Sequence, residues 1–260
     1  MKIKIIYLLV AALFLLITGK IVWAQTKQIH LQDADLKETS GIASSQINKN
    51  IFYVHNDSGD TSRFFAITPG GQLKSTFYFK ADPAHPNVNV VDCEDIAVGS
   101  GPVKGKSYIY LGDIGDNHAD RNLITIYRFL EPVIAENKTF SIKSDALHFK
   151  YPDGAHDAET LMVDPTEKLF YIVTKREDSV SVYTAPLNAS FTDTISLTKR
   201  CKIHFKGLPL LKWITAGDIS ADGNQILLKS YQKVYYWKRK KNEPVWKTLQ
   251  RKPTELPCSA

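Results

Sequence analysis

The sequence predicts an all-β protein, a β-propeller of four-stranded blades, and three observations support this. Short runs of β-branched and aromatic residues recur along the chain, turn residues separate them, and four pairs of runs open in a similar way. No stretch keeps a 3.6-residue apolar period long enough to predict a helix. With 260 residues, 43% of them hydrophobic, the chain can bury a large core as one domain.

The expected strands are short and apolar, as is typical of propeller blades. They are Ile51–Val54, Phe64–Ile67, Thr76–Phe79, Ile124–Tyr127, Phe170–Val173, Val180–Tyr183, Ile226–Leu228 and Val234–Trp237. Turn sequences such as Pro69-Gly70-Gly71 and Asp222-Gly223-Asn224 lie between them. Alternating strands and turns of this kind predict antiparallel sheets.

Four repeats begin at residues 41, 95, 159 and 218, and each opens with small or acidic residues before an apolar strand. A β-sandwich would also give many short strands, but it would not repeat this opening. We therefore expect the four openings to be the innermost strands of their blades. Ile42, Ile96, Leu161 and Ile219 should then be buried at equivalent positions. The chain ends inside a further repeat, which predicts about five blades with the last one incomplete.

Residues 1–24 have the pattern of a secretory signal peptide. Lys2 and Lys4 precede an apolar run from Ile5 to Ile17, and Val22-Trp23-Ala24 is a cleavage pattern before Gln25. An uncleaved N-terminal anchor is the alternative. We expect a mature domain of residues 25–260, secreted or periplasmic, monomeric and without a further membrane span.

Composition excludes several classes of function. Removal of residues 1–24 takes away three lysines and lowers the formal charge from +6 to +3, and the remaining lysines are scattered, so nucleic acid is not expected as a partner. Cys93, Cys201 and Cys258 are too few and too far apart for a disulfide scaffold or a zinc site. We expect Cys93 to be a small buried residue.

The order of short motifs resembles a family of exported bacterial propeller proteins of unassigned function, and more distantly the SdiA-regulated and NHL-type propellers. The motifs are Glu38-Thr39-Ser40-Gly41-Ile42-Ala43, His55-Asn56-Asp57-Ser58-Gly59-Asp60, Asp92-Cys93-Glu94-Asp95-Ile96-Ala97, Gly112-Asp113-Ile114-Gly115-Asp116-Asn117 and Ile126-Tyr127-Arg128-Phe129 before Glu131-Pro132. The resemblance covers residues 36–240 and implies a fold and a compartment, not an activity. Cys93 stands where the family usually has Trp, and the family continues into a further repeat.

The acidic residues at the strand ends predict a metal site. If inner-strand loops gather near the axis, carboxylates from different repeats converge there and repel one another unless a cation compensates. The expected ligands are Glu94, Asp95, Asp113, Asp116 and Glu159, and hard oxygen ligands indicate Ca²⁺ or Mg²⁺. The alternative is that these acids cap backbone N–H groups in turns.

Polar residues beside these acids predict a ligand site on the same face. They are His55, Asn56, Asp57, Asp60, Asn117, His118 and Lys175. The histidines could equally be hydrogen-bonded to neighbouring loops. No nucleophile elbow or phosphate-binding loop is present in the sequence. The sequence favours a binding or scaffold protein for a small ligand, a cation or a protein, and the alternative is a metal-dependent hydrolase of the phosphoesterase or esterase type.

Overall fold

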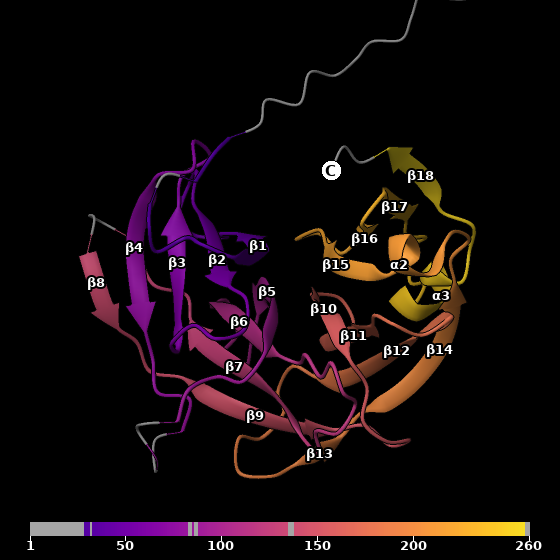
Figure 1. The fold of residues 1–260 in the computed structure, drawn as a ribbon, viewed down its shortest axis with the longest axis horizontal. Helices are drawn as coiled ribbons and strands as arrows, with labels where there is room; N and C mark the ends of the chain where they lie inside the picture. The colour runs from indigo at the N-terminus through magenta and orange to yellow at the C-terminus, as the bar shows by residue number, and fades with distance from the viewer. Residues whose placement is uncertain (1–28, 32, 83–84, 86–87, 135–137, 258–260) are drawn as a thin grey trace, which may run out of the picture. The chain divides into compact units, whose positions relative to one another are not determined.

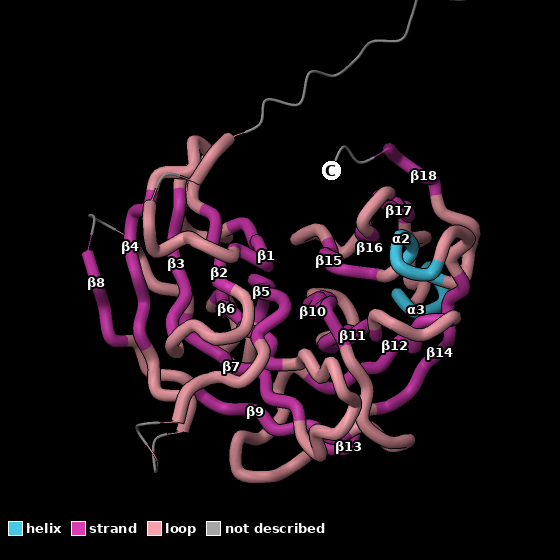
Figure 2. The backbone as a smooth tube through the Cα atoms, in the orientation of Figure 1, coloured by secondary structure: helices cyan, strands magenta, loops and turns pink. Residues whose placement is uncertain are grey.

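The computed structural model describes residues 29–31, 33–82, 85, 88–134 and 138–257. Within this part of the chain, the strands form four sheets arranged around a common centre, and only short helical segments interrupt them (Figures 1 and 2). The predicted fold class, an all-β propeller, is therefore confirmed. The predicted signal peptide lies outside the described residues. No helix in the described residues has the length and apolar character needed to cross a membrane.

The first two sheets each contain five strands. The first sheet has the order β1 (Thr39–Ser44), β2 (Phe52–Asn56), β3 (Arg63–Ile67), β4 (Leu73–Tyr78) and β8 (Lys138–Ser141). The second has the order β5 (Cys93–Ser100), β6 (Ser107–Asp113), β7 (Ile124–Leu130), β9 (Asp145–Lys150) and β13 (Ile195–Ser196).

The last two sheets each contain four strands. The third has the order β10 (Ala158–Asp164), β11 (Leu169–Thr174), β12 (Ser179–Pro186) and β14 (Thr198–His204). The fourth has the order β15 (Ile214–Ile219), β16 (Gln225–Ser230), β17 (Lys233–Lys238) and β18 (Thr254–Pro257), and the short helices are α2 (Pro209–Lys212) and α3 (Val245–Leu249). Because β18 completes the fourth sheet, the expected fifth repeat has no counterpart among the described strands.

Strand alternation gives the sheets two apolar faces, and sheets that are consecutive in the sequence share one core between them. Phe64 and Phe77 stack between the first and second sheets, with ring centroids 4.9 Å apart. Tyr110 meets Phe170 edge to face between the second and third sheets, and Met162 and Trp237 belong to the core between the third and fourth. Cys93 is buried in the first of these cores, as expected.

The first and fourth sheets are separated by pockets. Residues of both β1 and β15 line a pocket of about 640 Å³ and a second of about 510 Å³. The outer face of the first sheet, which carries Val54 and Phe65, is covered instead by Leu36 from the N-terminal segment. The described ring thus consists of three packed interfaces and one open one.

Ile42 contradicts the expectation that all four equivalent isoleucine or leucine positions are buried. Ile96 and Leu161 are buried as expected, and Ile219 is buried although its strand aligns differently, but Ile42 is 58% exposed. Its side chain faces the 640 Å³ pocket on the open side of the ring, where no sheet packs against it. The cause is therefore the missing interface and not the repeat pattern.

Each innermost strand begins with a β-bulge. The register shifts between Thr39 and Ile42 in β1, Cys93 and Asp95 in β5, Ala158 and Thr160 in β10, and Ile214 and Ala216 in β15. The extra residues at these positions are Ser40, Glu94, Glu159 and Thr215, and all four line the central pocket. Aligned by its bulge, the fourth repeat has Ala216 at the position equivalent to Asp95 and Gly217 at the position equivalent to Ile96. The expected alignment of Asp218 with Asp95 and of Ile219 with Ile96 is therefore wrong by two residues.

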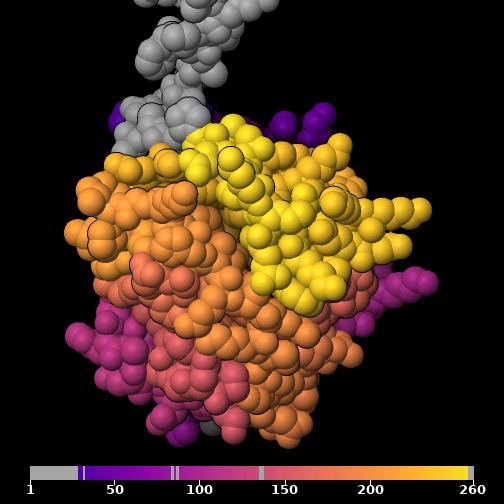
Figure 3. Space-filling model, turned by 90° about the vertical axis from the view of Figure 1, so that its right-hand side faces the viewer, coloured from indigo at the N-terminus to yellow at the C-terminus, as the bar shows by residue number. Residues whose placement is uncertain are grey.

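Strands from one sheet also extend the sheet before it. In the sequence, β8 comes between β7 and β9, which are neighbours in the second sheet. In the structure, β8 pairs in parallel with β4 of the first sheet. In the same way, β13 comes between β12 and β14 in the sequence but pairs in parallel with β9 of the second sheet. At the next position α3, which lies between β17 and β18, packs near β14 of the third sheet, and the C-terminal part of the chain (yellow) lies over the upper part of this face (Figure 3). These connections latch consecutive sheets together at their outer edges.

The Asp95 carboxylate joins three innermost strands at the centre. It accepts hydrogen bonds from the N–H of Ile96 in its own strand β5, at 2.9 Å, and of Leu161 in β10, at 2.8 Å. The N–H of Gly217 in β15 also hydrogen-bonds to it. Burial raises the pKa of Asp95, and these backbone donors oppose the shift. One buried side chain thus satisfies donors of the second, third and fourth sheets.

Asp95→Ala should lower the free energy of unfolding by about 3 kcal/mol, because buried N–H groups that lose their acceptor cost about 1–3 kcal/mol each. Asp218→Ala is the matched control. Asp218 also accepts the N–H of the next residue, Ile219, but it is exposed, so its loss should cost less than about 1 kcal/mol. Urea denaturation measures both, and equal losses would contradict the joining role of Asp95.

His55 of β2 bonds to β1 through Nε2 and to its own strand through Nδ1. Its Nδ1 lies 2.7 Å from the Asn56 carbonyl oxygen and donates to it, and its Nε2 accepts the Gly41 N–H at 3.0 Å. A Cβ on Gly41 would lie 2.6 Å from this ring nitrogen, so only glycine allows the approach. Burial lowers the pKa of His55 to about 4, and the ring is therefore neutral in the folded protein.

The stability that neutral His55 provides should be present above pH 6.5 and be lost as the pH falls towards 4. The unfolded chain takes up the proton near pH 6.5, whereas the folded protein does so only near pH 4. The advantage of wild type over His55→Gln in free energy of unfolding should therefore shrink by about 3 kcal/mol between pH 7 and pH 4. His118→Gln, at an exposed histidine, should show no such trend. A pH-independent difference for His55→Gln would refute the buried neutral ring.

Candidate functional site

The pocket at the centre of the described ring has a volume of about 640 Å³, which is a usual size for a small-molecule site. The four bulge residues contribute to its lining, together with Asp57, Lys175 and residues of the fourth sheet. The bulges turn these side chains out of the regular strand alternation and towards the axis. Local backbone irregularity thus builds the polar part of the pocket.

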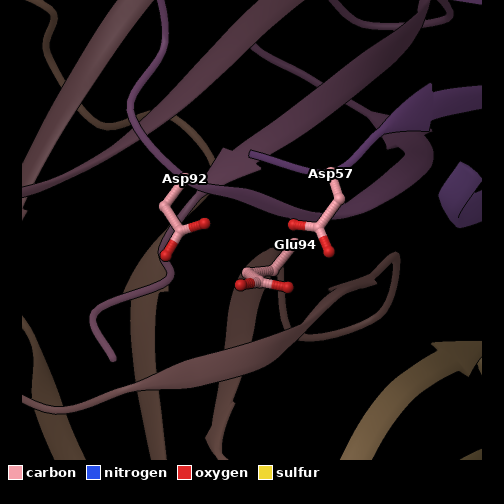
Figure 4. Close-up of side chains that lie close together, drawn as sticks. All are labelled: Asp57, Asp92 and Glu94. Atoms are coloured by element: carbon pink, nitrogen blue, oxygen red, sulfur yellow. The ribbon is translucent and has the colours of Figure 1, made fainter. Parts of the chain in front are cut away.

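Three carboxylates come together at this pocket. Asp57 directly follows β2, Asp92 directly precedes β5, and Glu94 is the bulge residue of β5. One oxygen from each lies within 4.8 Å of the other two, and the side chains point towards one another (Figure 4). We call Asp57, Asp92 and Glu94 the carboxylate cluster.

Glu94 is the unusual member of the carboxylate cluster. It is only 6% exposed, and among the described residues its carboxylate makes no hydrogen bond or ion pair. Burial, followed by the charges of Asp57 and Asp92, raises the pKa of Glu94 to about 9. Its side chain reaches the central pocket, and the repulsion from Asp57 and Asp92 favours a cation or a proton there.

Asp92 shares this environment. It is 9% exposed, and burial raises its pKa, with the charges of Asp57 and Asp157 adding to the shift. Gly115 lies close against the cluster, because a Cβ there would be 2.4 Å from Asp92 Oδ2 and 2.6 Å from Glu94 Oε1. The glycine allows the backbone to approach both carboxylates.

Four of the five acids predicted as metal ligands are engaged elsewhere. Asp95 accepts backbone N–H groups as described above, and Asp113 accepts the N–H of Val91 and Asp92 and pairs with Arg121. The Asp116 carboxylate accepts the N–H of Asp120 and Arg121, and Glu159 pairs with Lys175. The backbone contacts of Asp95, Asp113 and Asp116 match the capping alternative that the sequence left open, whereas Glu159 forms an ion pair. Only Glu94 of the predicted set belongs to the carboxylate cluster.

Only some of the residues predicted to bind a ligand line the central pocket. Asp57 and Lys175 line the central pocket. His55 uses both ring nitrogens within the protein.

The remaining four of these residues lie away from the pocket lining. Asn56 donates to Asp60, which in turn pairs with Arg63. Asn117 contacts Arg176, and His118 is exposed beside it. The central pocket thus retains two of the seven predicted residues.

Asp92 was not among the predicted site residues. The only signal in the sequence was its position two residues before Glu94, and strand alternation does not apply there because Glu94 is the bulge residue and Asp92 precedes β5. The sequence could not predict that Asp57, which follows a strand of another sheet, lies close to Asp92 and Glu94.

The carboxylate cluster has the chemistry of a divalent cation site. Oxygens that each lie about 2.4 Å from one Ca²⁺ are at most about 4.8 Å apart, which is compatible with the cluster as it stands. Three carboxylates would leave coordination positions for oxygens of a ligand in the pocket. Asp57 and Glu94 line the pocket, so these positions would face it.

Comparison with known proteins gives structural likeness only. No protein-family profile matches the sequence, and no curated protein matches it. Solved structures that it resembles include the Dos1 propeller (TM-score 0.38, 11% identity, 85% of this chain and 48% of that one) and a luciferin-regenerating enzyme (0.41, 11%, 85% and 63%). A third is an auxiliary nutrient binding protein from Bacteroides thetaiotaomicron (0.40, 13%, 85% and 41%). The chain spans less than two thirds of each of these structures.

Proposed function

We propose that this chain is a binding protein whose central pocket holds a divalent cation, Ca²⁺ or Mg²⁺, and through it a small ligand. The observation that carries the proposal is the buried, unpartnered Glu94 carboxylate facing Asp57 and Asp92. Asp95, Asp113, Asp116 and Glu159 have donors from the protein, so the lack of one in the described residues sets Glu94 and the adjacent Asp92 apart from them. A cation would supply the missing charge and leave open positions towards the pocket.

Binding is favoured over hydrolysis by the state of the neighbouring groups. A metal-dependent hydrolase would use a nearby base or cation to activate water and to stabilise the transition state. His55 is buried with both nitrogens bonded, and Lys175 pairs with Glu159. The groups next to the carboxylate cluster are therefore already engaged in protein contacts.

Ca²⁺ should stabilise the wild-type protein by about 2.7 kcal/mol at a hundredfold excess over its dissociation constant, because it binds only the folded form. Glu94→Gln should remove this stabilisation and, with chelator present, be no less stable than wild type, because it relieves the crowded charge. Glu177→Gln is the control, since Glu177 is half-buried but pairs with His156. Thermal unfolding with Ca²⁺, Mg²⁺ and chelator measures these effects.

Two outcomes would change the proposal. Unfolding midpoints that are the same with Ca²⁺, Mg²⁺ and chelator would remove the cation site. Turnover of chromogenic phosphate or ester substrates that needs the cation and disappears in Glu94→Gln would replace binding by hydrolysis.

We also propose that the protein is exported and that its mature chain begins near Gln25. The charge and apolar pattern of residues 1–24 support this. N-terminal sequencing of protein recovered from the periplasm or medium should find Gln25 or a close neighbour first. An intact Met1 on that protein would refute cleavage.

A further inference from the structure

We infer that the ligand of the central pocket is a neutral polyol that carries an apolar group, such as an alkyl glycoside. This inference rests on the proposed cation site and adds the class of molecule that the site takes. It follows from the two unlike walls of the pocket and from its charge.

One wall is polar and provides both donors and acceptors. It contains the paired Lys175 and Glu159 and the hydroxyl-bearing bulge residues Ser40 and Thr215, next to the carboxylate cluster. Hydroxyl groups of a polyol can coordinate a cation and also exchange hydrogen bonds with such side chains. A carbohydrate-like head therefore suits this wall.

The pocket has no surplus of positive charge that would select an acid. Its lining contains five carboxyl groups and two amines, so the carboxyl groups outnumber the amines, and one divalent cation does not create a large positive surplus. An anionic head would meet repulsion from the carboxyl groups that the cation does not neutralise. A neutral oxygen-rich head avoids this repulsion.

The other wall belongs to the open side of the ring, and it carries exposed apolar side chains beside Asp218 and Lys229. Ile42 of β1 is 58% exposed, Leu227 of β16 is 40% exposed, and Tyr231 and Val234 adjoin them on the fourth sheet. In the described residues no sheet packs on this part of the fourth sheet, so these side chains are available to a ligand. An apolar group on the polyol would bury them and gain affinity in proportion to the area removed from water.

The pocket therefore favours a molecule with two different ends. The polyol end lies at the cation and the polar wall, and the apolar end lies between Ile42 and Leu227. The two walls line one continuous pocket of about 640 Å³, so a single small molecule can reach both.

Isothermal titration calorimetry of the full mature chain with excess Ca²⁺ tests this inference. The probes are octyl glucoside below its micelle concentration, methyl glucoside, which has the same head without the tail, and octanoate, which has a similar tail on an acid. We expect octyl glucoside to bind at least about tenfold more tightly than either of the others. Chelator should abolish this binding.

The matched variants are Leu227→Ser and Leu256→Ser. Both leucines are exposed on the fourth sheet, at 40% and 44%, but only Leu227 lines the pocket. Leu227→Ser should weaken octyl glucoside binding about fivefold and leave Ca²⁺ binding unchanged, and Leu256→Ser should change neither. Because both positions are exposed, the folded state should tolerate the substitutions.

The outcomes separate the inference from the proposed function. Ca²⁺ binding without a preference for octyl glucoside would overturn the inference and keep the cation site, and so would equal effects of the two leucine variants. A preference for octanoate would replace the polyol by an amphipathic acid, and binding that survives chelator would overturn the cation anchor. A dimer that both variants dissociate would assign the apolar wall to a second copy. Absence of Ca²⁺ binding would overturn the proposed function and, with it, this inference.

Discussion

The buried Asp95 carboxylate is the interaction on which the centre of this fold depends. Innermost strands of a propeller approach the axis with unpaired N–H groups on the side away from their own sheet, and these groups need acceptors once water is excluded. Asp95 provides one acceptor for strands of three sheets. The β-bulges at the start of each inner strand then determine which side chains reach the axis. Asp95 and the bulge residues therefore determine both how the inner strands are joined and which side chains line the pocket.

The acidic residues near the axis fall into two physical classes. Asp95, Asp113 and Asp116 accept backbone N–H groups, so their burial stabilises the turns and strands around them. Glu94 is equally buried but has no such donor in the described residues. Folding alone gives no reason for a carboxylate in that position, since an apolar or amide side chain would cost less. This contrast between neighbours, and not the number of acids, distinguishes a candidate site from structural acids.

The sequence predicted the parts of this protein that depend on local patterns. Strand positions, the all-β class and the burial of Ile96, Leu161 and Ile219 follow from alternation and turn residues. The errors arose where a partner comes from far away in the chain. Ile42 resembles its equivalents, but the sheet that would bury it is not packed there, and the bulge in β15 moves the fourth repeat by two residues. The carboxylate cluster could not be predicted completely because Asp57 and Asp92 meet only after two sheets pack together.

The latching strands also determine the order in which a growing chain can assemble. The first sheet receives its last strand only when Ser141 has been synthesised, and the second only when Ser196 has been. The first and second blades therefore each remain one strand short until the following blade is partly made. During synthesis on the ribosome an open strand edge advances along the nascent chain, and unpaired edges are sites of aggregation. The same connections that couple the finished blades thus make completion of the first two blades depend on synthesis of the blade that follows each of them.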